Sequence, residues 1–208
     1  MKNKSFYLKC ILLFAVPFLN IYLKHNFIGF KDFVYYSTID IYVLFIVYGF
    51  IALLFDNSKY VSEWKPETYS RRFNRKQWIR NLFFYTFLVQ LETVIIVFFI
   101  ILFNAFINGI YITFGTDIVL ILLVFYLFLL DVKFIYIVSM TLTKNLYKAL
   151  ILPFLFILSC ILFSHRFSVT SMYDISIISA FGVILIICIL ISKLRLSKSD
   201  IINRHIGK

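Results

Sequence analysis

IVLILLVFYLFLLDVKFIYIVSM, residues 118–140, is an apolar run that contains only two charged residues, Asp131 and Lys133. A bilayer core of about 30 Å takes around 20 helical residues at a 1.5 Å rise, so this run is long enough to cross it. Its apolar residues are continuous, whereas a strand of a membrane barrel alternates lipid-facing with lumen-facing residues. The run therefore predicts a transmembrane helix, in which backbone groups bond to one another within the lipid.

Five further apolar runs of spanning length accompany this one, and 62% of the 208 residues are hydrophobic while 15% are charged. Soluble domains are nearer half apolar and a quarter charged, so a soluble core of this size would not bury so much apolar surface. We predict a single transmembrane domain over residues 1–208, an all-α integral membrane bundle of six transmembrane helices. The spans are expected at about residues 6–23, 33–55, 82–103, 118–140, 146–163 and 172–191.

Lysine and arginine fall mainly on alternate connections between these spans. They are concentrated at the N-terminus, in segment 56–81, between the fourth and fifth spans and in the tail, whereas the other connections contain only Lys24, Lys31 and Arg166. Cytoplasmic loops carry an excess of Lys and Arg, so the N- and C-termini are both expected to be cytoplasmic. This topology, together with anionic inner-leaflet lipid, accounts for the net charge of +11 without a nucleic-acid partner.

The location follows from the same composition. Ile, Phe, Lys, Asn and Tyr are abundant relative to Ala and Gly, which indicates AT-rich coding and a low-GC bacterium. We therefore expect a multi-pass protein of the bacterial cytoplasmic (plasma) membrane.

The segment 56–81 is the longest predicted cytoplasmic stretch. From Glu67 to the third span it lacks Gly and Pro, so it is predicted to be helical. Tyr69 and Phe73 lie one turn apart and share a face, and Trp78 lies just before the span, where an indole favours the headgroup level. The residues alone leave open whether this segment docks a soluble partner or is a basic juxtamembrane loop that serves topology and lipid contact.

Ionisable residues inside the predicted spans are expected to face protein or water, because each costs around 3 kcal/mol in lipid on insertion scales. Asp131 and Lys133 are two residues apart and point to different sides of their helix, which makes them poor partners for each other. Lys133 is better placed to meet Glu92 of the third span. We predict an intramembrane polar cluster of Glu92, Asp131 and Lys133, which either lines a substrate path or is a structural ion pair between two helices.

No motif in the sequence indicates an enzyme. With only six glycines the chain has no phosphate-binding loop, and neither HExxH nor GxSxG occurs. Cys160 and His165 are a thiol and a base, but a spacing of five residues at the end of a helix does not place them face to face. Cys10, Cys160 and Cys188 all fall within spans and are interpreted as small packing residues. We expect no catalytic site, metal site or cofactor in this chain.

The second and third spans, with the run Arg72-Phe73-Asn74-Arg75-Lys76-Gln77-Trp78 between them, resemble the permease subunits of type 2 ATP-binding-cassette (ABC) exporters. The likeness is to small members that serve peptide, bacteriocin and lantibiotic export or immunity, and the basic tail from Lys193 to Ile202 is similar to the end that follows their sixth helix. The resemblance implies that 56–81 is a cytoplasmic coupling segment that sits in a cleft of a separate ATPase subunit. The residues it assigns to this contact are Glu67, Arg71, Arg72, Phe73, Arg75 and Trp78.

The resemblance also implies the partners and the activity. It predicts a permease that pairs with a second copy or a homologous permease and exports an apolar or amphipathic substrate, a peptide by preference. ATP and Mg would be bound by the partner ATPase. Two other interpretations stay open: a stand-alone membrane immunity or accessory protein, which the absence of a neighbouring ATPase gene would favour, and the substrate-binding membrane subunit of a vitamin importer, which predicts tight binding of a small ligand.

Overall fold

The computed structural model describes residues 11, 13, 15, 29–38, 47–55, 75–143, 148–164 and 175–198. Every regular element within these ranges is a helix, and none is a strand, as the all-α prediction requires. Three of the helices are long and apolar enough to cross a membrane. The elements are α2 (Phe30–Thr38), α3 (Gly49–Phe55), α6 (Arg75–Ile107), α7 (Thr116–Thr143), the 3₁₀ turn η2 (Lys148–Leu150), α8 (Ile151–Ser164) and α9 (Ile175–Lys198).

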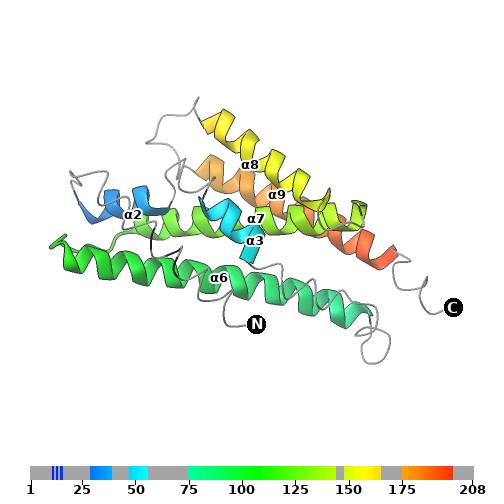
Figure 1. Ribbon diagram of the computed structural model, residues 1–208, viewed down its shortest axis with the longest axis horizontal. Coiled ribbons are helices and arrows are strands. Elements are labelled where there is room, and N and C mark those ends of the chain that lie inside the picture. Colours follow the sequence, from blue (N-terminus) through cyan, green and yellow to red (C-terminus); the bar gives the residue numbers. More distant parts are fainter. Residues whose placement is uncertain are drawn as a thin grey trace.

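Helix α7 is the centre of the fold. It contacts α2, α3, α6, η2, α8 and α9, and Figure 1 shows it running between α6 on one side and α8 and α9 on the other. In the apolar, membrane-length part of α7, 61% of the residues are buried by the rest of the protein. The corresponding share is 33% in α6 and 22% in α9. A helix that is apolar all round is expected at the centre of a bundle, because no face of it favours water.

Aromatic contacts fix how α8 and α9 pack on this central helix. The ring of Phe128 lies 6.2 Å from that of Phe156 in α8 and 6.1 Å from that of Phe181 in α9, measured between ring centroids. On another side of α7, Phe134 packs against Phe83 and Phe87 of α6 at 5.2 and 5.5 Å. The two halves of α7 therefore use different faces for different neighbours.

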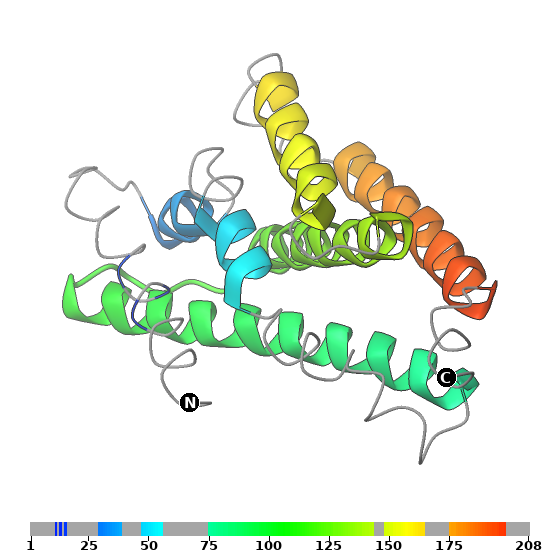
Figure 2. The ribbon, with the colours of Figure 1, turned by 45° about the vertical axis from the view of Figure 1, so that its right-hand side comes forward.

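A tight turn reverses the chain between α6 and α7. The N–H of Ile110 donates to the carbonyl of Ala105 at 2.9 Å, and the N–H of Gly109 donates to that of Phe106 at 3.2 Å. This pair of bonds is the Schellman pattern, which satisfies the last carbonyls of a helix and needs a left-handed residue. Gly109 supplies it with a φ of 67°. The result is an antiparallel pair of long helices, seen side by side in Figure 2.

Three of the predicted spans correspond to single long helices: the third to α6, the fourth to α7 and the sixth to α9. The fifth corresponds to η2 and α8, whose apolar part, Lys148–Leu162, is shorter. Pro153 lies in the first turn of α8, a position at which proline is tolerated.

The second predicted span, 33–55, coincides with α2 and α3, with residues 39–46 between them outside the described part. The two helices are linked by Tyr48, whose hydroxyl donates to the carbonyl of Ser37 at 3.0 Å. The Tyr48 ring also lies 4.7 Å from that of Phe125, which anchors this region to α7. Of the first predicted span, only residues 11, 13 and 15 are described, so six crossings and the location of the termini stay predictions.

The outer faces of the long helices are apolar. Phe84 and Phe99 of α6 are each 64% exposed, and Leu155 of α8 and Ile186 of α9 are more than half exposed. A soluble monomer rarely exposes such continuous apolar surface. This surface and the three long apolar helices give the chain the character of a membrane protein.

Candidate functional site

The predicted coupling segment lies mostly outside the described residues. Glu67, Arg71, Arg72 and Phe73 fall in the undescribed range, so their contact with an ATPase stays a prediction. Arg75 and Trp78 belong to the first turns of α6, which begins at Arg75 and continues without interruption into the apolar part of the helix. With 33 residues, α6 is about 50 Å long at 1.5 Å per residue, which exceeds the thickness of a bilayer core.

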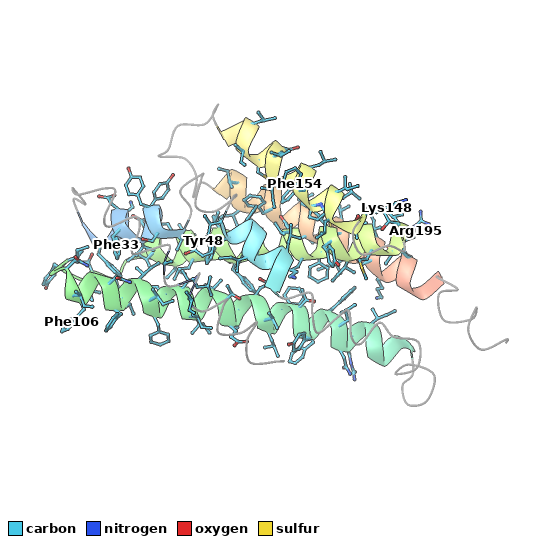
Figure 3. The ribbon with its side chains drawn as sticks, viewed as in Figure 1. Phe33, Tyr48, Phe106, Lys148, Phe154 and Arg195 are labelled. Carbon is cyan, nitrogen blue, oxygen red and sulfur yellow. The ribbon has the colours of Figure 1, made fainter. Side chains whose placement is uncertain are left out.

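Cations gather at one end of the bundle, where α6 begins, α7 ends, α8 begins and α9 ends (Figure 1). Arg80, Lys148, Lys193 and Arg195 are exposed there, and Figure 3 shows Lys148 and Arg195 at this same end. We call it the basic end. Figure 3 places Phe33 and Phe106 at the opposite end. The described residues thus reproduce the uneven distribution of charge that the sequence shows.

At the opposite end, an ion pair joins two connections that were both expected on the non-cytoplasmic side. Nζ of Lys31, in the first turn of α2, lies 2.5 Å from Oδ2 of Asp117, in the first turn of α7. The side chains are 42% and 46% exposed, so solvent screens the pair. Sequence reasoning did not find this contact, because the partners are 86 residues apart.

Asp131 is the most deeply buried acid that the structure describes. Its side chain is fully buried, and neither carboxyl oxygen has a hydrogen-bond partner. It lies within electrostatic range of Cys160 in α8 and of Cys188 in α9. Asp131 follows Phe128 by three residues and so lies on the same side of α7, the side that packs on α8 and α9.

Lys133 is also buried, at 2% exposure, but it faces another side of α7. It stands two turns after Tyr126, whose hydroxyl donates to the carbonyl of Phe87 in α6 at 3.2 Å. Residues seven apart share a helix face, so Lys133 lies on the α6 side. Its Nζ is 5.9 Å from the ring centroid of Tyr136. No ion pair joins Lys133 to Asp131, in agreement with the two-residue spacing.

The structure does not bring Glu92 together with these two residues. Glu92 is exposed on the outer face of α6, beside Leu88 and Ile95. Because Phe134 packs between Phe83 and Phe87, Glu92 lies about 9 Å further along the bundle axis than Lys133 at 1.5 Å per residue. The predicted cluster is thus divided into a buried carboxyl, a buried ammonium group and a carboxyl on the outer surface.

A buried polar stripe on α6 went unpredicted. Each of its members is at most 2% exposed; they are Thr86, Gln90, Thr93 and Asn104. Thr86 and Thr93 each donate to the carbonyl four residues earlier, and so does the Asn104 amide. The available signal was the spacing of four, three and eleven residues, because each of these places polar side chains on one helix face. This stripe faces the bundle, away from the exposed apolar face.

Among the described residues, no group of three or more His, Cys, Asp or Glu side chains is arranged to hold a metal ion. Comparison with protein-family models, with curated proteins and with solved structures found no match. The described part of the chain combines buried hydrogen-bonding groups inside an apolar bundle with exposed cations at one end.

Proposed function

We propose that this chain is the transmembrane permease subunit of an ABC exporter in the bacterial plasma membrane. It pairs with a second permease and moves an apolar or amphipathic substrate, a peptide by preference. The energy comes from ATP that a separate ATPase subunit hydrolyses in the presence of Mg. In this proposal the basic end faces the cytoplasm, and segment 56–81 contacts the ATPase.

One observation carries the proposal: the C-terminal part of the predicted coupling segment and the third span belong to a single helix. A helix transmits displacement along its axis because each backbone hydrogen bond ties one turn to the next. A movement imposed near Arg75 and Trp78 by an ATPase therefore tilts or shifts all of α6. Since α6 packs against α7 through Phe83, Phe87 and Phe134, the centre of the bundle follows.

The distribution of charge supports the expected sidedness. Lys148 and Arg195 lie at the basic end in Figure 3, and cytoplasmic ends of membrane helices are enriched in Lys and Arg. The ion pair of Lys31 with Asp117 supports it as well, because both residues lie in connections that were expected on the other side.

The test is co-purification of the tagged chain from its native membranes in mild detergent. We expect a subunit with ATP-binding motifs in the eluate, identified by mass spectrometry, together with ATP hydrolysis. Arg72→Ala combined with Arg75→Ala is expected to lose this subunit, whereas Lys31→Ala at the opposite end is expected to retain it. A wild-type chain that recovers no ATPase subunit contradicts the proposal, and so does the double variant if it recovers as much ATPase as the wild type.

A further inference from the structure

The hydroxyl groups of this bundle divide into two kinds. Those of Thr86, Thr93 and Ser159 donate to the carbonyl four residues earlier in their own helices, at 2.8 or 2.9 Å. This local bond is how a Ser or Thr inside an apolar helix is normally satisfied. Ser37 of α2, Ser139 of α7 and Ser192 of α9 are fully buried, yet none of the three Oγ atoms has a partner. Of these, Ser139 and Ser192 lie on the two helices α7 and α9 that pack together.

Counting residues places Ser139 and Ser192 at similar levels along the contact between α7 and α9, which we call the seam. The count starts from the contact of Phe128 with Phe181, and in Figures 1 and 2 the two helices run in the same general direction and cross obliquely. Ser139 follows Phe128, and Ser192 follows Phe181, by the same eleven residues, which is close to three helical turns. Both serines thus return to the face that carries the aromatic contact.

Asp131 and Cys188 continue this polar series toward the middle of the bundle. The buried residues of α9 are Phe181, Leu185, Cys188 and Ser192, a single stripe at spacings of four and three that faces α7. Cys188 lies one turn from Ser192 and within electrostatic range of the Asp131 carboxyl. In the other direction, Ser192 is followed by the exposed cations Lys193 and Arg195. Ser192, Cys188 and Asp131 are thus groups able to form hydrogen bonds between the basic end and the middle of the bundle, and Cys188 lies among apolar side chains such as Phe134 and Leu185.

We propose that this seam admits water from the basic end as far as Asp131, and that Asp131 binds and releases a proton on that side. A carboxylate without a partner is strongly disfavoured in an apolar bundle, so the group requires either a proton or water. Water is the smallest partner for orphaned hydroxyls, and buried waters commonly bridge such groups. On proton uptake, an O–H bond forms on a carboxyl oxygen as one O–H bond of a hydronium ion breaks and leaves a water molecule.

The neighbours of Asp131 are compatible with this role. Among the residues that the structure describes, the titratable groups that interact electrostatically with Asp131 are the thiols of Cys160 from α8 and Cys188 from α9, neither of which forms a disulfide. Lys133 lies on the opposite side of α7 and forms no ion pair with it. The proposal does not depend on an ATPase partner, and it assigns the buried carboxyl a function that no motif of the sequence indicates.

The test uses the purified full chain in lipid nanodiscs and infrared spectroscopy of the protonated carboxyl C=O band. We expect a band that Asp131→Asn removes, that shifts in D₂O and that declines at high pH. The double variant Ser139→Val with Ser192→Val should slow the D₂O shift by about tenfold, the factor that a lost hydrogen bond gives. Ser159→Val on the exposed face of α8 is the control and should leave the rate unchanged. If the D₂O shift is as fast in the Ser139→Val, Ser192→Val double variant as in the wild type, the proposal is overturned.

A second measurement does not rely on a variant at Asp131. With Cys10 and Cys160 replaced by serine, Cys188 remains as the single thiol. A small, membrane-impermeant thiol reagent should modify it from the side of the basic end, and Ser192→Val should slow this reaction. Lack of modification from that side, or modification from the opposite side alone, contradicts the water route.

Discussion

Lys31 donates to the carboxylate of Asp117 across the opposite end of the bundle and ties the start of α2 to the start of α7. The pair is exposed, so its stability contribution is modest. Asp117 has a second role, because an acid in the first turn of a helix interacts favourably with the helix dipole.

The two roles predict unequal effects. Lys31→Gln should lower the free energy of unfolding by about 0.2–1 kcal/mol, and Asp117→Asn by about 0.5–1.5 kcal/mol because the dipole interaction is lost as well. The double variant should be no less stable than Asp117→Asn, since the pair is lost only once. Thermal unfolding in detergent at low salt measures these differences, and high salt should shrink them. An additive double variant would show that the two side chains do not interact in solution.

Gly109 is predicted to be the glycine of the α6–α7 turn that is hardest to replace. Its φ of 67° lies in the left-handed region, where a side chain costs roughly 1–2 kcal/mol. Gly109→Ala should therefore destabilise the protein by about that amount. Gly115→Ala is the matched control. A Cβ atom at either glycine meets open space, but of the two only Gly109 has a left-handed φ. The melting temperatures of Gly109→Ala and Gly115→Ala are measured side by side with that of the wild type. Equal decreases in the two variants would count against the Schellman turn.

Gly49 permits α3 to approach α8 closely. A Cβ atom at this position would lie 2.8 Å from Cδ1 of Ile157 and 3.6 Å from Cζ of Phe128. Gly49→Val should destabilise the protein by about 1–3 kcal/mol, the usual cost of overpacking. Adding Ile157→Ala should recover part of that loss by making room. If Ile157→Ala adds its full cost to that of Gly49→Val, the close approach of the two helices is not present.

Glu92 and Lys133 are predicted to act independently. Because Glu92 is exposed and lies further along the axis, Glu92→Gln and Lys133→Met should have additive effects on unfolding within about 0.5 kcal/mol. Lys133→Met should have the larger effect, since it changes a buried side chain. A double-mutant cycle in thermal or denaturant unfolding measures the coupling. A coupling energy well above this limit would restore the ion pair between the third and fourth spans.

Much of the fold was predictable from the sequence. The runs that became α6, α7 and α9 were identifiable because apolar continuity over a bilayer thickness is a local property of the chain. The turn at Gly109 also depends on local sequence, although it was not predicted. Of the candidate site, the opposite orientations of Asp131 and Lys133 follow from helical periodicity alone. The location of Arg75 and Trp78 in a helix was predicted from the lack of Gly and Pro after Glu67.

Partners across helices were not predictable. A transmembrane helix such as α7 is apolar on every side, so periodicity does not reveal which face meets α6, α8 or α9. The expected contact of Lys133 with Glu92 depended on the rotation and the axial offset of two helices, and the sequence specifies neither. The exposure of Glu92 and the pairing of Lys31 with Asp117 both result from such offsets.

The amino-acid sequence by itself determined that the chain forms long apolar helices with cations unevenly distributed along it, because helix formation in lipid and charge placement depend on local composition. The tertiary structure alone decided that α7 lies at the centre, that Asp131 is buried without a partner, and that the hydroxyls of Ser139 and Ser192 are buried without one. The physical reason is that the shape of the contacting side chains determines which helices pack together in a bilayer, as in the contact between Phe128 and Phe181. Hydrophobicity does not determine it, because lipid and protein are equally apolar.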